Sequence, residues 1–341
     1  MYDLIVCGAG PIGSYLGLRF SKRGYKTLVL EEHSEIGKPL ACSGLMSKRL
    51  WDFIPYNKKL IEKEIEGARI HLDKNVYTFR SNQAIVVNRV SLDRYMYKLA
   101  VERGAEYSLL SRLINFFEEG DKVSIYYKNK GKIINVHSRL LAGTDGPLSK
   151  VRKILNLREP NYLQGVFTYV EEEGDSFVDI YLKDSPGFFV WKIPRSMGLM
   201  EYGIASNRRA IFYFRKFMRK KGIKPRKIYS GLIPYGLLPS ITSRRVFLCG
   251  DAASQVKPYS GGGVIYGLTS AKIASDVICP KNPNMKEYES RWRNEIGKEI
   301  KTGMWIKRFY RLPSPLLKIM LNILSKKKGL DMDKPSTILG D

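Results

Sequence analysis

Two glycine-rich stretches, one near each end of the chain, hold the residues best suited to chemistry. The first reads Gly8-Ala9-Gly10-Pro11-Ile12-Gly13, and the second contains Gly250-Asp251 and Gly261-Gly262-Gly263. Each follows an apolar run and opens a helical pattern, so free backbone N–H groups and the positive end of a helix would face the same point. Both stretches therefore predict binding of a phosphate or another electron-rich group.

The first stretch has the full context of a dinucleotide-binding unit. An apolar strand precedes the glycines, a helical pattern follows them, and a second apolar strand over 27–30 ends at Glu31. Gly8 would allow the tight turn, Gly10 the approach of a pyrophosphate, and Gly13 the close packing of helix on strand. The Glu31 carboxylate would hold the adenosine ribose hydroxyls and would repel a 2′-phosphate.

The sequence between the two stretches favours FAD over NAD. An NAD enzyme of this type would continue with further strand–helix units, whereas the alternating segments 69–72, 76–80 and 123–127 predict antiparallel sheet. Because FAD is long, its adenine end would bind the first stretch and its flavin end would need the second. There, Asp251 would accept hydrogen bonds from ribityl hydroxyls or anchor the loop, and a helix beginning at Val264 would direct its N–H groups at the flavin.

These elements predict a mixed α/β fold: a Rossmann-like FAD-binding domain with an inserted antiparallel-sheet substrate domain and a helical C-terminus. The 341 residues are enough for two domains. We expect a discontinuous FAD-binding domain over 1–55, 84–155 and 240–280, a substrate-binding domain over 56–83 and 156–239, and a basic helical segment over 281–341. The last residues, 331–341, are expected to form a loose tail.

The charge balance points to an anionic partner. The chain has 58 Lys and Arg against 33 Asp and Glu, a net charge of +25. No acidic residue lies between Glu201 and Asp251, and the segment Arg208–Lys227 is rich in Lys and Arg. This segment is either a solvated face or a contact for lipid phosphates or an acidic redox protein. No recognisable nucleic-acid-binding module accompanies it, so we expect no nucleic-acid partner.

The C-terminal segment contains an amphipathic helical pattern with a basic end. Its apolar face is formed by Leu316, Leu317, Met320, Leu321 and Leu324, and Lys326-Lys327-Lys328 follow. Such a helix lies in a membrane interface or packs on the FAD-binding domain, and both readings stay open. No apolar run approaches the roughly 18 residues of a spanning helix. We expect a cytoplasmic protein, with peripheral contact at the inner face of the cell membrane as an open question.

Several further motifs carry a family resemblance. Asn88–Arg94 is similar to an R-x-x-F-D-R motif, and Thr144–Gly146 and Gly250–Ala253 are similar to conserved turns of FAD-dependent hydroxylases. Pro39–Gly44 matches a P-x-x-C-x-G loop, and Phe189–Pro194 resembles a Y-x-W-x-F-P segment with Phe for Tyr and Ile for Phe. The chain thus resembles the geranylgeranyl reductase family, in the p-hydroxybenzoate hydroxylase branch of the glutathione-reductase-type flavoproteins.

The resemblance implies an FAD-dependent oxidoreductase that acts on CH–CH groups and saturates isoprenoid chains of a polyprenyl lipid, with an archaeal membrane ether phospholipid favoured. The expected cofactor-binding residues are Gly8, Gly10, Ile12, Gly13, Glu31, Cys42, Ser43, Gly44, Arg89, Leu113, Asp251, Gly262, Gly263 and Val264. The expected substrate contacts are Phe189, Trp191, Pro194, Tyr235 and Tyr259. In this reading the Arg89 guanidinium neutralises the pyrophosphate.

Cys42 is the catalytic candidate. It would shape the flavin loop, relay a proton or take part in redox switching; the alternative is a small apolar residue in a tight loop. We expect no metal site. The electron donor is open between a ferredoxin and NAD(P)H, and an aromatic hydroxylase or an electron-carrying flavoprotein on the same FAD scaffold remains an alternative function.

Overall fold

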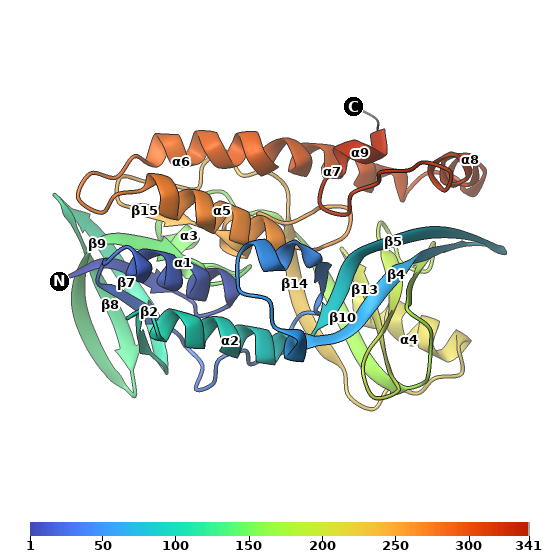
Figure 1. The fold of residues 1–341 in the computed structure, drawn as a ribbon, viewed down its shortest axis with the longest axis horizontal. Helices are drawn as coiled ribbons and strands as arrows, with labels where there is room; N and C mark the ends of the chain where they lie inside the picture. The colour runs from blue at the N-terminus through green and yellow to red at the C-terminus, as the bar shows by residue number, and fades with distance from the viewer. Residues whose placement is uncertain (340–341) are drawn as a thin grey trace.

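Two β-sheets with helices packed on them form the fold of this computed structural model, which describes residues 1–339. One sheet lies toward the end of the molecule that holds the N-terminus, and the other lies at the opposite end (Figure 1). The first sheet has the spatial order β6 (Glu106–Ser108), β2 (Thr27–Leu30), β1 (Tyr2–Cys7), β9 (Lys132–Gly143), β8 (Lys122–Asn129) and β7 (Ser111–Glu119), with β15 (Val246–Leu248) also paired to β9.

The first sheet is parallel at its centre, where α1 (Pro11–Lys22) packs against β1 and β2. Strands β6, β2, β1, β9 and β15 pair in parallel, and β1 is buried over Leu4–Cys7. Helices α1, α2 (Arg89–Val101) and α5 (Val264–Val277) pack beside one another, while β7, β8 and β9 form an antiparallel meander. The chain leaves β1 toward β2 on one side and meets β9 on the other, so the strand order reverses at β1, where α/β sheets bind ligands.

The second sheet is mainly antiparallel, as the alternating segments predict. Its order is β14 (Tyr229–Tyr235), β10 (Asn161–Glu171), β13 (Leu199–Ser206), β12 (Phe189–Pro194), β11 (Phe177–Leu182), β4 (Ile61–Leu72), β5 (Asn75–Val87) and β3 (Leu45–Ser47). Only the β11–β4 pair is parallel. Since β3 lies inside the expected segment 1–55 and β5 runs past residue 83, strand and domain limits differ there, and the domain boundaries stay predictions.

Alternate residues of the second sheet face two different layers. Val190 on β12 and Met200, Tyr202 and Ile204 on β13 pack under α4 (Ala210–Lys220). Phe189 and Trp191 project to the opposite face, as the two-residue period of a strand requires. That face meets the C-terminal helices.

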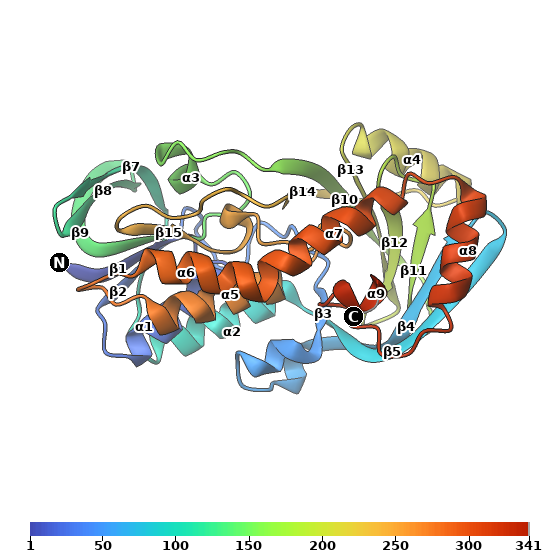
Figure 2. The same cartoon turned by 90° about the horizontal axis from the view of Figure 1, so that it is seen from above.

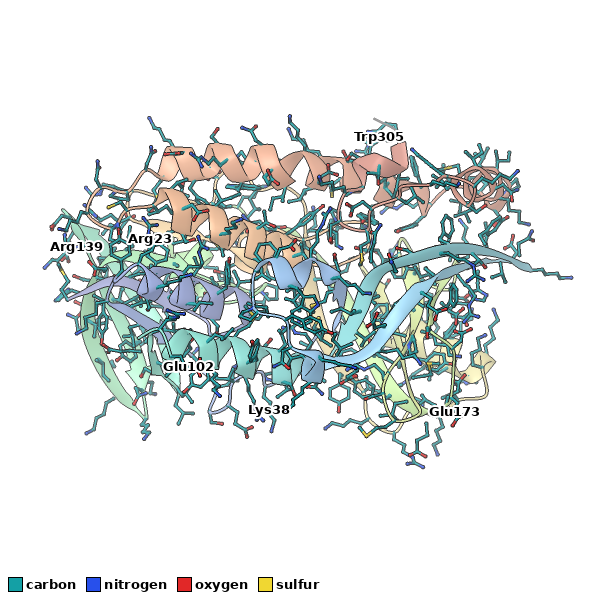
Figure 3. The ribbon with its side chains drawn as sticks, viewed as in Figure 1. Arg23, Lys38, Glu102, Arg139, Glu173 and Trp305 are labelled. Atoms are coloured by element: carbon teal, nitrogen blue, oxygen red, sulfur yellow. The ribbon has the colours of Figure 1, made fainter. Side chains whose placement is uncertain are left out.

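The C-terminal helices run along the molecule from the first sheet to the second. Helix α6 (Met285–Trp292) continues through a π-helical turn over Arg293–Gly297 into α7 (Lys298–Phe309), alongside α5 (Figure 2). Trp305 lies on the exposed side of α7 (Figure 3). Helix α8 (Ser314–Leu324) then packs on the second sheet, and a short α3 (Lys150–Ile154) and α9 (Ser336–Leu339) complete the set. Within residues 1–339, no helix has both the length and the apolar character needed to cross a membrane.

The expectation of a loose C-terminal tail is wrong for residues 331–339. The Asp333 carboxylate pairs with the Lys257 ammonium at 2.8 Å, and both side chains are buried. The phenol of Tyr259 donates to the Met332 carbonyl at 2.6 Å, and the phenol of Tyr266 donates to the Asp333 carbonyl at 2.8 Å. This C-terminal tail therefore packs against the second glycine stretch, and residues 340–341 lie outside the described chain.

Candidate cofactor and substrate site

Three loops that are far apart in the sequence meet at the carboxyl ends of β1, β9 and β15. The Thr144 hydroxyl donates to the carbonyls of Cys7 at 2.8 Å and Gly8 at 2.9 Å, which joins the loop after β9 to the first glycine stretch. A Cβ at Gly250 would lie 2.9 Å from Ile12, so the loop after β15 also contacts this point. The two glycine stretches and the Thr144–Gly146 turn thus form one site, at the switch point of the sheet.

The glycines of the first stretch are required for two different reasons. Gly8 has φ +99°, and a Cβ at Gly13 would lie 1.9 Å from the Gly8 carbonyl oxygen, so the fold of the chain itself excludes side chains there. A Cβ at Gly10 would have no atom of residues 1–339 within 4 Å apart from its chain neighbours. The space beside Gly10 is open, and it fits a pyrophosphate approaching the backbone at the start of α1.

Glu31 links the first stretch to the end of β2. Its carboxylate accepts from the Ala9 N–H at 2.8 Å and from the His33 N–H at 3.0 Å. The His33 ring Nδ1 also lies 2.7 Å from Glu31 Oε1, so the acceptor capacity left for a ribose hydroxyl is on Oε2, which receives the Ala9 N–H. The Glu31 carbonyl accepts from the Ser111 N–H at 2.7 Å, which brings the start of β7 to the same place; Leu113, two residues further, is buried.

Arg89 occupies the first turn of α2, where the Asn88 side chain caps the helix through the Ser91 N–H. Its guanidinium donates to Asp93 at 3.0 Å, but its buried Nε finds no acceptor among residues 1–339. Burial disfavours the cation, yet Asp93 and the adjacent Cys42 more than compensate and raise the pKa of Arg89. A permanently charged group with an unused donor fits a phosphate oxygen.

Asp251 lies on the other side of Arg89. Burial raises the pKa of Asp251 to about 6, and the Arg89 charge opposes that rise. A Cβ at Gly263 would lie 2.8 Å from the Asp251 carboxylate, so the carboxylate sits directly under the N-terminus of α5, which begins at Val264 as predicted. Arg89 and Asp251 therefore offer a donor and an acceptor close to each other at the second glycine stretch, where FAD could use both.

The second glycine stretch is held from behind by the C-terminal tail. A Cβ at Gly262 would lie 2.8 Å from the Lys257 side chain, and Lys257 is the residue that pairs with Asp333. The ion pair fixes the loop that leads into α5. No sequence pattern pointed to this contact, because the two residues are separated by most of the C-terminal segment.

The Cys42 loop joins the two sheets. Gly44 has φ +77°, and a Cβ there would lie 2.1 Å from the Val87 carbonyl, so the loop lies flat on the end of β5. Arg195, directly after β12, donates to the Ser43 carbonyl and pairs with Glu62 at 2.7 Å. Cys42 itself lies beside Arg89. The loop expected at the flavin is thus tied both to the candidate cofactor site and to the second sheet.

Glu201 is a site residue that the sequence reading missed. Its side chain is 0% exposed and lies on β13, on the face of the second sheet to which Trp191 of β12 projects. The Trp191 indole N–H donates to it at 2.9 Å, and Arg195 lies 3.4 Å away. Burial raises the pKa of Glu201 to about 7, opposed by Arg195 and by the Trp191 hydrogen bond. A single carboxylate inside the apolar run Leu199–Ser206 was the signal that could have revealed it.

Three of the five expected substrate contacts, Phe189, Trp191 and Tyr235, gather in one aromatic cluster, whereas Tyr259 and Pro194 lie outside it. Phe189 stacks on Phe188 with ring centroids 4.3 Å apart, and both rings meet the Tyr310 ring edge-on at 5.8 Å. Trp191 and Tyr235 pack against the same cluster. The Tyr310 hydroxyl donates to the Tyr259 carbonyl at 2.6 Å, which connects the cluster to the second glycine stretch.

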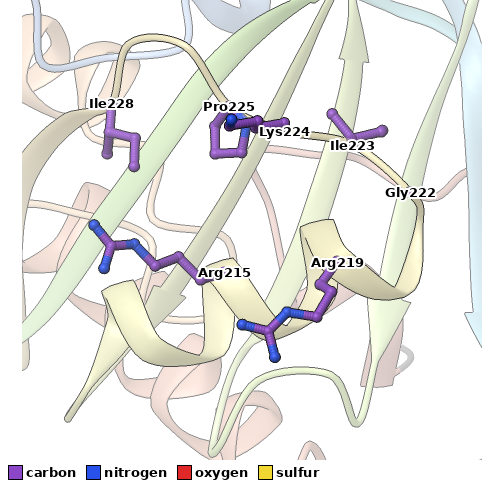
Figure 4. A pocket seen from close by; sticks show the side chains of 7 residues that line it. All are labelled: Arg215, Arg219, Gly222, Ile223, Lys224, Pro225 and Ile228. Carbon is purple, nitrogen blue, oxygen red and sulfur yellow. The ribbon is translucent and has the colours of Figure 1, made fainter.

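The basic segment Arg208–Lys227 forms a surface away from the glycine stretches. A hollow of about 510 Å³ lies between α4 and the following loop, and Arg215, Arg219 and Lys224 border it (Figure 4). Its lining residues in the described chain include no carboxylate. It is suited to an anionic surface rather than to FAD.

Comparison with known proteins finds relatives with this fold. Residues 44–212 match an FAD binding domain family. The chain is 31% identical to an uncharacterized protein of Methanocaldococcus jannaschii, over 97% of this chain and 90% of that one, and 28% identical to a digeranylgeranylglycerophospholipid reductase of Methanococcoides burtonii, over 91% and 84%. A solved structure of a geranylgeranyl bacteriochlorophyll reductase-like protein from Thermoplasma acidophilum covers 100% of this chain and 96% of its own, with a TM-score of 0.91 and 22% identity.

The fold and these matches define an FAD-dependent oxidoreductase. More narrowly, the chain belongs to the geranylgeranyl reductase family. The fold class, the cofactor and the family expected from the sequence are therefore confirmed. The individual cofactor and substrate contacts remain predictions, which the geometry above brings together in one place.

Proposed function

We propose that this protein saturates C=C bonds in the geranylgeranyl chains of an archaeal membrane ether phospholipid. The observation that carries the proposal is the contact between the Cys42 loop and the strand that bears Trp191, made by Arg195 and Glu201. It brings an aromatic, water-poor surface next to the site expected for the flavin. Relatives named digeranylgeranylglycerophospholipid reductase, which align over most of their length, support the same substrate class.

Saturation of an isolated C=C bond adds one hydride and one proton. Reduced FAD, when bound, supplies the hydride. The chain's own task is to hold the alkene in line and to exclude water, because no carbonyl polarises the bond. Phe189, Trp191 and Tyr235 would form the apolar wall, and Cys42 would hold or pass the proton. Burial raises the pKa of Glu201 to about 7, so this carboxyl beside Trp191 holds a proton near neutral pH.

The experiment that tests the proposal is an anaerobic turnover. The flavin spectrum is recorded, the protein is reduced with dithionite, and a geranylgeranylated phospholipid is added. We expect flavin reoxidation together with a gain of two hydrogen atoms per saturated double bond, measured by mass spectrometry. Bound flavin without lipid reduction would contradict the proposal and would favour the aromatic hydroxylase or the electron carrier.

We further propose a ferredoxin-like acidic protein as the electron donor. The hollow bordered by Arg215, Arg219 and Lys224 supports this choice, since an acidic partner would be attracted to a surface with this charge. In the turnover assay, reduced ferredoxin should replace dithionite, and its rate should fall as salt is raised. A rate with NADPH that equals the ferredoxin rate would contradict this assignment.

We also propose peripheral contact with a membrane through α8. Its inner residues Leu317 and Leu321 pack on the second sheet, so the helix does not lie free. Its outer side carries three exposed apolar residues at helical spacing, Leu316, Ile319 and Ile323, and Lys326-Lys327-Lys328 follow. An exposed apolar strip with an adjacent basic run suits an anionic lipid surface.

The double variant Ile319→Glu/Ile323→Glu tests this contact. The side chains are 58% and 65% exposed, so the fold should tolerate the change. We expect sedimentation with vesicles containing anionic lipid to fall at least about tenfold, because two apolar groups are replaced by charges that the lipid repels. Ile133→Glu, at a 70% exposed position on β9 at the opposite end of the molecule, is the matched control (Figure 1). Equal sedimentation of all three proteins would refute membrane contact through α8.

A further inference from the structure

A second basic hollow lies between α4 and the turn that joins α7 to α8. Its volume is about 560 Å³, and four cationic side chains line it: Lys183, Lys216, Lys220 and Arg311. Asp184 is the one carboxylate among its lining residues in the described chain, and it pairs with Lys220 at 3.4 Å. The hollow thus has an excess of about three positive charges and attracts an anion.

A mostly buried cation four residues before Arg311 of this hollow is the second observation. Lys307 on α7 is 7% exposed and lies over the Tyr235 ring at 4.3 Å. Within residues 1–339 it forms no ion pair and no side-chain hydrogen bond. Burial and, to a smaller extent, the Arg311 charge lower the pKa of Lys307 to about 8. Two neighbouring cations, one of them buried, are expensive unless an anion compensates them.

The position of the hollow relative to the aromatic cluster indicates what the anion belongs to. Tyr310 lines the hollow and also packs edge-on against Phe188 and Phe189. On the other side of the cluster, Phe188 lies 3.9 Å from the Cβ position of Gly261, in the second glycine stretch. The aromatic rings therefore separate a cationic hollow from the loop expected at the flavin. A molecule that spans both would need an anionic end and an apolar body.

We propose that Lys307, Arg311 and Lys216 bind the phosphate of the substrate's head group while the prenyl chains cross the aromatic cluster toward the flavin. The inference rests on the proposed function for the identity of the lipid. The ligand that we assign to the cationic hollow itself is a phosphate group.

Equilibrium binding to the FAD-loaded protein tests the assignment. The probes are digeranylgeranylglyceryl phosphate in detergent, the same lipid without its phosphate, and inorganic pyrophosphate. The variants are Lys307→Met, Arg311→Gln and Lys216→Gln. Lys307→Met and Arg311→Gln each remove a charge-assisted contact to phosphate. Each variant should therefore bind the phosphorylated lipid at least about tenfold more weakly, while its affinity for the unphosphorylated lipid should not change.

The matched control is Lys224→Gln, which removes an exposed cation from the other basic hollow. Arg311 and Lys216 are exposed, so their variants should fold even if Lys307→Met does not. Competition by pyrophosphate that disappears in the variants would support a site for phosphate from either source, and a loss confined to the lipid would support the head group alone. The phosphate site would be overturned if the variants bound the phosphorylated lipid as tightly as Lys224→Gln does, or if they lost affinity for both lipids equally.

Binding and turnover separate this inference from the proposed function. Phosphate-dependent binding without saturation of the lipid would leave the phosphate site standing and remove the proposed reaction. Saturation of both lipids at equal rates, unaffected by the variants, would leave the reaction standing and overturn the phosphate site.

Discussion

Alanine at position 13 should deprive the protein of FAD and of much of its stability. The added Cβ would lie 1.9 Å from the Gly8 carbonyl oxygen and 2.6 Å from the Thr144 hydroxyl. The first contact is with backbone, which cannot rotate away, so α1 must shift relative to β1. Overpacking of this kind costs about 1–3 kcal/mol, a sizeable part of the stability of an ordinary domain.

Gly10→Ala is the matched control because the same methyl group meets no described atom within 4 Å there. Gly10 has φ −63° and ψ −179°, which alanine adopts without strain. The apoprotein should therefore keep its stability within about 0.5 kcal/mol. FAD affinity should still fall at least about tenfold, since the methyl group would occupy the space into which the pyrophosphate must come.

Two measurements on each protein decide this prediction: the urea midpoint of the apoprotein and the FAD dissociation constant from flavin fluorescence. The expected pattern is a lower midpoint for Gly13→Ala alone and weaker FAD binding for both variants. If Gly10→Ala bound FAD as the unmodified protein does, the pyrophosphate would not lie where the first stretch predicts. An unchanged urea midpoint for Gly13→Ala would show that the loop accommodates a Cβ at this position, contrary to the prediction.

The glycine stretches were predictable because their conformation is determined by residues close by in the sequence. The turn at Gly8, the strand end at Glu31 and the helix start at Val264 follow from apolar runs and residue types within a few positions. The α5 N-terminus, the parallel centre of the first sheet and the antiparallel second sheet were obtained in the same way. These features survive in the sequence because each short segment favours the conformation that the fold gives it.

Features that depend on distant partners were not predictable. Nothing near Asp333 indicates that its carboxylate meets Lys257, and nothing near Glu201 indicates that Arg195 and Trp191 enclose it. The face expected for α8 illustrates the same limit: Leu317 and Leu321 pack inward as a face should, but the neighbouring strip with Ile319 stays exposed. Helical spacing groups residues on a face, but only tertiary packing decides which face is covered.

Arg195→Met should strongly destabilise the second sheet. The Arg195 side chain is nearly buried between Glu201 and Glu62, and it also donates to the Ser43 carbonyl. Removing one partner from a buried ion pair leaves an uncompensated charge and costs about 3–5 kcal/mol. The Cys42 loop would lose its tie to the second sheet at the same time, so turnover should fall more than FAD affinity does.

The loss of folding stability caused by Arg195→Met should increase as pH rises. The folded-state pKa of Glu201, about 7, lies above its ordinary value of 4.5, so the folded protein holds the proton more tightly and stability falls as pH rises through this window. Arg195 lowers this pKa, and its removal extends the window upward. Arg195→Met should therefore be far more damaging at pH 8 than at pH 5, as judged by urea midpoints at the two pH values.

The double variant Arg195→Met/Glu201→Gln separates the charge from the packing. Glutamine keeps an acceptor for the Trp191 N–H without a buried charge, so the double variant should recover at least about 1–2 kcal/mol of the loss at pH 8 and show little pH dependence. Glu62 is partly solvated and needs less compensation. If Glu201→Gln gave no rescue and Arg195→Met cost the same at both pH values, the carboxylate at 201 would not be the charge that Arg195 neutralises. Rescue of stability without rescue of turnover would instead assign Arg195 its second task, the positioning of the Cys42 loop through Ser43.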